Sequence, residues 1–183
     1  MIGIIDYGLG NIKAISNIYD KLKIKNILVR SKNDFEKVAK LILPGVGSFD
    51  SAMDLLSKNN CKDSINSMVL KKEKKILGIC VGMQTFAKNS DEGSKKGFNW
   101  IEGEVKKFEF NSRYRLPHMG WNSIKKNIEN PLFKNINNDE YFYFCHSYYY
   151  KCLKKEDIIA ETSFGLSFAS SINFKNIYGI QFH

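Results

Sequence analysis

The first half of the 183-residue chain alternates short apolar runs with segments whose apolar residues recur at helical spacing. The apolar runs predict strands at Ile2–Asp6, Ile24–Arg30, Lys40–Leu43 and Lys75–Ile79. The helical spacing predicts helices over Asn11–Leu22, Ser48–Leu56, Lys62–Leu70 and Val81–Lys88, and a short capped segment begins at Asn33-Asp34. Strands that alternate with helices predict an α/β fold with an open, mostly parallel sheet and helices on both faces.

The second half is β-rich, with few helical patterns between its apolar runs. These runs are Trp100–Phe110, Tyr141–Cys145, Ile158–Thr162, Leu166–Asn173 and Ile177–Phe182. They predict that antiparallel or mixed strands extend the parallel sheet. No repeat, low-complexity segment or linker interrupts the pattern, so we expect a single domain over residues 1–183.

Composition narrows the class of protein. An apolar fraction of 43% with 13% aromatic residues excludes a disordered chain. No apolar run approaches the roughly 20 residues of a membrane helix, and no secretory signal opens the chain, so we expect a cytoplasmic protein. The four cysteines form no CxxC pair, so we expect no metal and no cofactor.

A net charge of +9 is typical of proteins that bind nucleic acid. Only three of the 28 basic residues are arginines, and the lysines are spread along the chain. Nucleic-acid readers favour arginine because its guanidinium binds phosphate and guanine in a bidentate manner. We therefore interpret the charge as a solvated surface, with no nucleic-acid or membrane partner.

The sharpest local motif is G-x-C-x-G at Gly78, Cys80 and Gly82, between a predicted strand and a predicted helix. It is the cysteine form of a nucleophile elbow, a sharp turn from a strand into a helix with the nucleophile at its apex. The residues two positions before and two positions after the nucleophile must be glycine, because a β-carbon there would clash with the neighbouring backbone. The helix N-terminus favours a thiolate, and the N–H of Val81 points where an oxyanion would form. The alternative is a buried structural cysteine in a tight crossover.

An elbow enzyme needs a second oxyanion donor from a neighbouring loop. The glycine-rich turn Leu43–Phe49 follows the third predicted strand, and the amide of Val46 or Gly47 is the candidate donor. The alternatives are an ordinary turn or a weak phosphate loop. The turn lacks the lysine and the spacing of a P-loop, so nucleotide binding is improbable.

A nucleophilic thiol also needs a base, and the chain has three histidines. His183 and His146 each follow a β-run, which places them at a sheet edge where α/β proteins carry their sites. His118 lies in a predicted loop bounded by proline and glycine. The local pattern ranks His183 and His146 together and His118 below them.

Six motifs follow one another along the chain: DYGLGN at Asp6–Asn11, LPGVGSF at Leu43–Phe49, GICVGMQ at Gly78–Gln84, LPHMGWN at Leu116–Asn122, YFCHSYY at Tyr143–Tyr149 and the terminal GIQFH. The elbow, the glycine-rich turn and GIQFH resemble the class I (triad-type) glutamine amidotransferase family, whose fold is flavodoxin-like. The first five motifs are, more specifically, similar to those of the glutaminase subunits of imidazole glycerol phosphate synthases. Together they span nearly the whole chain.

The resemblance implies that Cys80 attacks the side-chain amide of glutamine and forms a thioester, with His183 as the base. It implies that the substrate is held by Gly47, Gln84, His146, Ser147 and Tyr148. It also implies that ammonia passes to a (β/α)₈-barrel cyclase in a heterodimer. The matching interface positions are Asn11, Met119, Trp121 and Asn122.

In that family a proline and then a glutamate follow the histidine, and the glutamate orients the imidazole. The sequence stops at His183, so we expect an incomplete chain rather than a protein without the acid. Three alternatives stay open: a paralogous glutaminase that feeds another partner, such as a surface-glycan sugar amidotransferase; an inactive subunit; and an esterase-like hydrolase. Gln84 and the segment from His146 to Tyr148 argue against the esterase, because an ester pocket has no need to hold a zwitterion.

Overall fold

The computed structural model describes residues 1–58, 61–109, 114–137 and 140–183. Parallel strands of the first half lie in the order β2-β1-β3-β4. Their bounds are β1 (Ile2–Ile5), β2 (Asn26–Val29), β3 (Lys40–Gly45) and β4 (Lys75–Cys80). The helices are α1 (Ile12–Lys21), α2 (Lys32–Lys37), α3 (Phe49–Lys58), α4 (Cys61–Asn66), which continues into a π-helical turn η1 (Ser67–Lys71), and α5 (Val81–Gln84).

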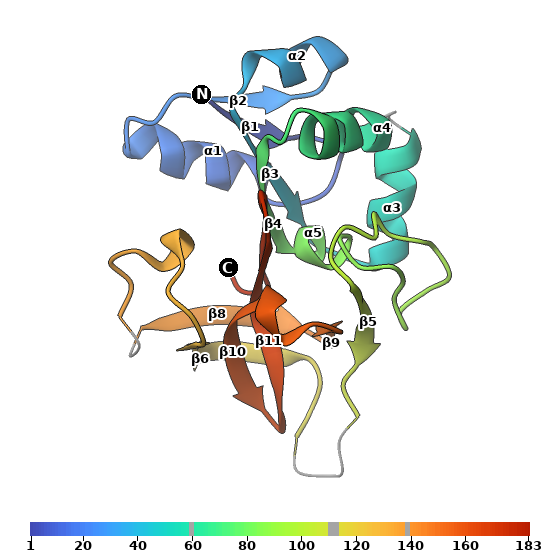
Figure 1. Cartoon of the computed structure of the whole chain (residues 1–183), viewed down its shortest axis with the longest axis vertical. Coiled ribbons are helices and arrows are strands. Elements are labelled where there is room, and N and C mark those ends of the chain that lie inside the picture. The colour runs from blue at the N-terminus through green and yellow to red at the C-terminus, as the bar shows by residue number, and fades with distance from the viewer. Residues whose placement is uncertain (59–60, 110–113, 138–139) are drawn as a thin grey trace.

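Helices cover both faces of the parallel strands, as the sequence predicts. In Figure 1 these strands are seen nearly edge-on, with α1 on one side and α3 and α4 on the other. Every residue of β3 after Lys40 is buried, as expected for a central parallel strand. The helix α1 packs less closely on its face of the sheet than α3 does on the other face. No residue of α1 is fully buried, and a cavity of about 410 Å³ lies between α1 and the strand ends.

The second half extends the sheet with antiparallel strands. Strand β12 pairs parallel to β4 and antiparallel to β11, so the change of direction falls at this strand. The order continues β12-β11-β10-β7, while β9 pairs with β11 and β5, and β6 pairs with β8 in a separate sheet. The bounds are β5 (Gly103–Lys107), β6 (His118–Ser123), β7 (Lys125–Lys126), β8 (Tyr141–His146), β9 (Tyr148–Cys152), β10 (Ile158–Phe164), β11 (Leu166–Phe174) and β12 (Ile177–Ile180), with 3₁₀ turns η2 (Pro131–Phe133) and η3 (Lys155–Asp157).

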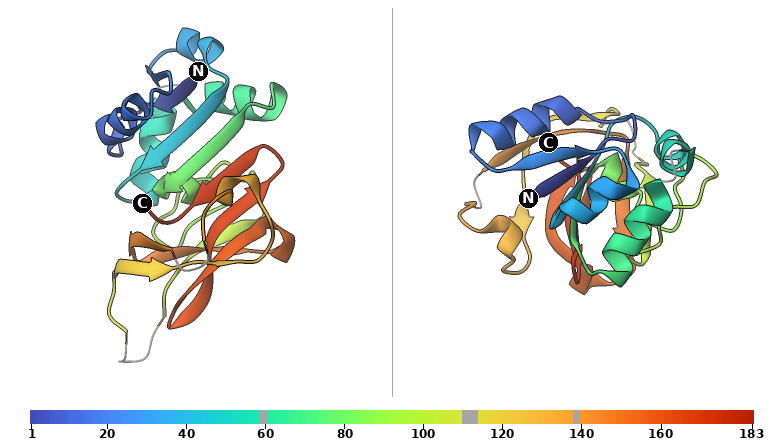
Figure 2. Two further views of the ribbon diagram at one scale, coloured as in Figure 1. Left: turned by 90° about the vertical axis from the view of Figure 1, so that its left-hand side faces the viewer. Right: turned by 90° about the horizontal axis from the view of Figure 1, so that it is seen from above.

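Two buried apolar clusters form the core, and the larger one also takes in second-half residues such as Val105, Tyr150 and Ile172. One lies under the parallel strands and their helices, and the other packs Phe144 and Phe168 between β6, β8, β10 and β11. Figure 2 shows the parallel strands at one end of the molecule, the β-rich half at the other, and the C-terminus between them. The chain therefore ends where the two halves meet.

Three local predictions need correction. His118 begins β6 rather than lying in a loop, because it pairs with His146 across the β6–β8 ladder. The helix expected over Val81–Lys88 ends at Gln84, because the carbonyls of Thr85 and Phe86 accept from Phe98 and Trp100 instead of from a following turn. Strand β3 runs through Pro44 to Gly45, which pairs with Cys80. Of the run Trp100–Phe110, Phe110 lies outside the described residues.

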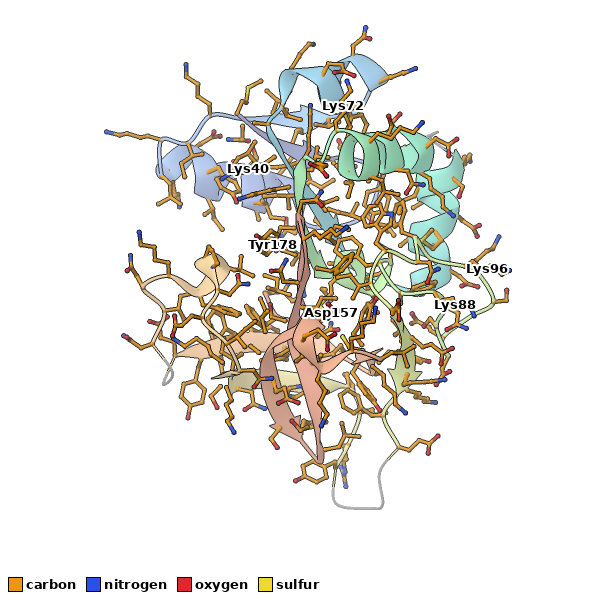
Figure 3. The ribbon with its side chains drawn as sticks, viewed as in Figure 1. Lys40, Lys72, Lys88, Lys96, Asp157 and Tyr178 are labelled. Carbon is orange, nitrogen blue, oxygen red and sulfur yellow. The ribbon has the colours of Figure 1, made fainter. Side chains whose placement is uncertain are left out.

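The lysine-rich surface has the dispersed character that the sequence predicts. In Figure 3 the labelled Lys40 and Lys72 lie in different parts of the fold from Lys88 and Lys96, which are close to each other in the segment after α5. Lys72 pairs with Glu36 at 2.6 Å, with both side chains about half exposed. None of the helices that the structure describes has the length and apolar character needed to cross a bilayer.

Candidate active site

Cys80 lies at the sharp turn from β4 into α5. Its backbone φ is +56°, in the left-handed region that side chains rarely adopt. A β-carbon on Gly78 would lie 2.5 Å from Phe86 and 2.7 Å from the Met83 nitrogen, and one on Gly82 would overlap the Leu43 carbonyl oxygen. The predicted steric need for both glycines is confirmed. The strained backbone costs about 1–3 kcal/mol, which is typical of functional turns.

The glycine-rich turn after β3 lies beside this elbow. Gly45 is the ladder partner of Cys80, and a β-carbon there would lie 2.5 Å from the Gly82 nitrogen. Gly47 has φ of +113°, which favours glycine. The turn therefore brings the backbone of Val46 and Gly47 close to the cysteine.

A cavity of about 250 Å³ opens at the elbow. Every residue that the sequence assigns to catalysis, to the oxyanion or to the substrate lines it: Val46, Gly47, Cys80, Val81, Gln84, His146, Ser147, Tyr148 and His183. They come from segments that are far apart in the sequence. The C-terminal edge of the parallel strands and the start of the β-rich half form this cavity together.

Three lining residues have no counterpart in the sequence predictions: Glu92, Pro117 and Cys145. Glu92 follows α5 in an irregular segment, where one of its carboxylate oxygens accepts from the Phe49 N–H at 2.6 Å. Glu92 lies in none of the motifs, while Pro117 belongs to the LPHMGWN motif without a role assigned to it there. Cys145 alternates outward on β8, which is visible only once the strand register is known.

Burial controls the charge state of the nucleophile. Burial raises the pKa of the Cys80 thiol to about 11, and the nearby Cys145 and Glu92 raise it further. Hydrogen bonds from the Val81 N–H and the Gln181 amide lower this pKa, but by less. The expectation of a thiolate favoured by the helix N-terminus is therefore wrong for the resting site, since α5 is a single turn and desolvation outweighs its dipole. Burial also lowers the pKa of His183. The resting pair is a thiol and a neutral imidazole.

Hydrogen bonding separates the two histidines that the sequence leaves equal. Both ring nitrogens of His146 have protein partners: Nδ1 lies 2.8 Å from the Tyr148 carbonyl oxygen, and Nε2 lies 3.0 Å from Nδ1 of His118. Within the described part of the chain, the ring of His183 has no such partner, while its backbone N–H donates to the Tyr143 carbonyl. His183 is therefore the histidine whose ring nitrogens are available to the cavity.

Two buried amides lie behind the nucleophile. Gln84 Nε2 donates to the Tyr148 carbonyl oxygen at 3.1 Å and to Gln181 Oε1 at 2.9 Å. Gln181 Nε2 in turn donates to Cys80 Sγ at 3.6 Å. Gln181 is missing from the sequence predictions because it lies within the terminal apolar run, where its pattern resembles that of a strand.

The four predicted interface residues differ in exposure. Met119 and Trp121, on β6, are 61% and 71% exposed, so neither is packed in the core. Asn11 precedes α1 and lines the cavity beside that helix. Asn122 faces the interior, where its amide contacts His118 and the Ser163 carbonyl.

A cysteine at a strand–helix elbow, opposite a histidine at the C-terminal edge of an open α/β sheet, defines a class of hydrolytic enzymes with a thiol nucleophile. The sequence model described as "Glutamine amidotransferase class-I" matches residues 3–183, and the chain belongs to this family. Its fold and its class as an amidotransferase enzyme thus agree with the sequence prediction.

Individual relatives carry more specific names. An "Imidazole glycerol phosphate synthase subunit HisH" from Leptospira interrogans is 44% identical over 186 residues, covering 100% of this chain and 91% of that protein. A "HisH 2" subunit from Methanococcus maripaludis is 42% identical, with the same coverage of both chains. The resemblance to this group is confirmed across the whole chain.

Solved structures share the fold at low sequence identity. A crystal structure named as a glutamine amidotransferase superposes with a TM-score of 0.77 at 17% identity, covering 100% of this chain and 89% of that one. A glutamine amidotransferase from Thermotoga maritima gives 0.68 at 16% identity, covering 100% and 74%. These likenesses support the fold alone.

Proposed function

We propose that the chain, as a single domain over residues 1–183, is the glutamine-hydrolysing subunit of an imidazole glycerol phosphate synthase in histidine biosynthesis. The observation that carries the proposal is the cavity in which Cys80 and His183 meet the amides of the β3 turn. The names of relatives 41–44% identical over the full chain support the pathway.

The chemistry follows from the neutral resting pair. His183 accepts the Cys80 proton as Sγ bonds to the side-chain amide carbon of glutamine. The N–H groups of Val81 and of Val46 or Gly47 stabilise the oxyanion. The carbon–nitrogen bond then breaks, and His183 gives its proton to the departing ammonia. Water attacks the resulting thioester, again with His183 as base, and glutamate leaves with Cys80 restored to a thiol.

The polar lining suits an amino-acid substrate. Both amide hydrogens of Gln84 are used within the protein, so only its Oε1 is available and it can accept from a substrate N–H. The Glu92 carboxylate in the same cavity attracts the α-ammonium of glutamine. Gly47, Ser147 and Tyr148 form the remaining wall. His146 contributes shape rather than a proton, because its ring nitrogens are engaged.

The proposed partner is a (β/α)₈-barrel cyclase, bound as a heterodimer on the face that carries Met119 and Trp121. An exposed tryptophan beside an exposed methionine is typical of an interface centre. Asn11 lines the cavity beside α1, and His183 lines the same cavity. We assign Asn11 and the β6 residue Asn122 as further contacts of the cyclase. Ammonia would pass from the cysteine to the partner without release to solvent.

The decisive experiment measures ammonia release from glutamine by the purified chain, alone and with the cyclase plus its nucleotide ligand. Activity that appears or rises with the partner supports the proposal. Replacing Cys80 by alanine abolishes turnover and leaves partner binding intact. The matched control is Cys152→Ala, which removes a thiol that does not line the cavity. Turnover that survives Cys80→Ala contradicts the assigned nucleophile.

The second candidate is a subunit without glutaminase activity, an alternative that the sequence leaves open. An absence of ammonia both with and without the cyclase would select this candidate. Ammonia delivered only to another amidating partner would select the paralogue, and hydrolysis of simple esters instead of glutamine would select the esterase.

A further inference from the structure

A continuous chain of buried hydrogen bonds runs from the nucleophile into the β-rich half. It begins at Cys80 Sγ, which accepts from Gln181 Nε2 at 3.6 Å. Gln181 Oε1 accepts from Gln84 Nε2 at 2.9 Å, and Gln84 Nε2 also donates to the Tyr148 carbonyl oxygen at 3.1 Å. The same carbonyl accepts from His146 Nδ1 at 2.8 Å. The chain thus links the elbow to β8.

The far end of the chain fixes its own proton positions. Asn122 Nδ2 donates to the Ser163 carbonyl at 3.1 Å, while its Oδ1 accepts from a backbone N–H, so its amide has one orientation. The same Nδ2 lies 3.3 Å from His118 Nε2, which must therefore accept. His118 then carries its proton on Nδ1 and donates to His146 Nε2 at 3.0 Å.

The Tyr148 carbonyl orients the amide next to the sulfur. Its oxygen accepts one bond from His146 and one from Gln84. Because a carbonyl oxygen only accepts, Gln84 must present its nitrogen to it, and therefore also to Gln181 Oε1. Gln181 is left with only its nitrogen facing Cys80. The reversed amide would set an oxygen against the sulfur and oppose thiolate formation.

Burial keeps the arrangement rigid. Gln84, Gln181, His118 and His146 are all at most 5% exposed. The His118 ring is stacked against Phe144 and Phe164, with ring centroids 4.8 Å and 4.1 Å apart. Each of these four side chains thus has a fixed partner and little contact with bulk water, which makes a change of amide orientation costly.

We propose that Gln181 is a positioning residue that holds an amide donor on the Sγ atom of Cys80, and that the Tyr148 carbonyl, acting through Gln84, keeps this donor in its orientation. The inference rests on the proposed role of Cys80 as nucleophile. Donation to the sulfur stabilises the negative charge that develops as His183 takes the proton, in a site where burial opposes that charge. The hydrogen bond from Gln181 thereby offsets part of the free-energy cost that burial adds to forming the Cys80 thiolate.

The test measures alkylation of Cys80 by iodoacetamide at pH 8, followed on the Cys80 peptide by mass spectrometry. The variant Gln181→Met removes the donor at similar side-chain length, and we expect alkylation about three- to tenfold slower, since the thiolate fraction falls tenfold per pKa unit while nucleophilicity partly compensates. Gln181→Glu keeps an acceptor for Gln84 but no donor for Cys80, and we expect it to be at least as slow. Both variants lower kcat for glutamine more than they change KM.

Two further variants locate the effect. His118→Phe keeps the ring stacking and leaves the Tyr148 carbonyl in place, so we expect alkylation at the wild-type rate. Ser171→Ala is the matched control, because it removes a buried hydrogen bond to the Gly179 carbonyl that is no part of the chain. It leaves the alkylation rate unchanged.

The outcomes separate this inference from the proposed function. Wild-type alkylation rates in Gln181→Met and Gln181→Glu, with turnover still lost in Cys80→Ala, overturn the role of Gln181 and leave the nucleophile standing. Slow alkylation in both variants, with no glutaminase activity in the wild type, supports the positioning role and refutes the proposed function. Slow alkylation in His118→Phe would overturn the assignment of the amide orientation to the Tyr148 carbonyl.

Discussion

At the scale of single residues, burial sets the chemistry of this cavity. It keeps Cys80 as a thiol and lowers the pKa of His118 to about 4 and that of His146 to about 3. Neutral histidines are required by the hydrogen-bond chain, because a proton on both nitrogens of His146 would face the proton that His118 donates. The electrostatics and the geometry therefore support the same protonation states.

A pH-dependent stability follows from His146. Its pKa is lowered from 6.5 to about 3 in the folded protein, so the unfolded chain binds the proton first as the pH falls. The contribution of the neutral His146 to the free energy of unfolding is fully present above pH 6.5 and is lost progressively as the pH falls from 6.5 toward 3. Between pH 7.5 and pH 5 we expect a loss of about 2 kcal/mol from this residue in urea unfolding. The variant His146→Gln has a correspondingly flatter pH dependence, and an unchanged slope would contradict the buried neutral state.

At the scale of elements, the elbow depends on close approach between β3, β4 and α5. Gly45 packs against Gly82, and Gly82 against the Leu43 carbonyl, so two strands and a helical turn meet without side chains between them. This contact holds the β3 turn at the cysteine. The oxyanion donors are thus positioned by backbone packing.

Replacing Gly82 by alanine tests this contact. The added methyl group overlaps the Leu43 carbonyl, and we expect a loss of about 1–3 kcal/mol in unfolding free energy together with loss of glutaminase activity. Gly8→Ala is the control for steric overlap, since the new methyl group has only Leu55 near it, at 3.8 Å, although the backbone of Gly8, unlike that of Gly82, has positive φ. Gly8→Ala keeps its activity at a cost of about 1 kcal/mol. Full activity in Gly82→Ala would contradict the need for close contact between β3 and α5 at the elbow.

At the scale of the whole molecule, the active cavity lies between the parallel half and the β-rich half. The exposed face of β6 carries Met119 and Trp121, while the inward face carries His118 and Asn122. One short strand thus faces the proposed partner on one side and the hydrogen-bond chain on the other. A partner on this face would bind close to the cavity, because Pro117 at the start of β6 lines it.

Trp121→Ala separates binding from folding. Its side chain is 71% exposed, so we expect unfolding free energy to change by less than about 0.5 kcal/mol. We expect affinity for the cyclase to fall by about tenfold or more, measured by titration calorimetry. Leu153→Ala is the matched control, because Leu153 is equally exposed but lies after β9, away from this face. Equal affinities for the two variants would place the interface elsewhere.

The sequence by itself determined the α/β class, the elbow around Cys80 and the turn at Gly47, because apolar periodicity and glycine spacing are local consequences of backbone geometry. Its motifs also determined the family. Only the tertiary structure decided that β6 is a strand, that His146 is engaged while the His183 ring nitrogens are available, and that Glu92 and Gln181 belong to the site. Those features depend on contacts between residues up to 101 positions apart and on burial, which no local pattern encodes.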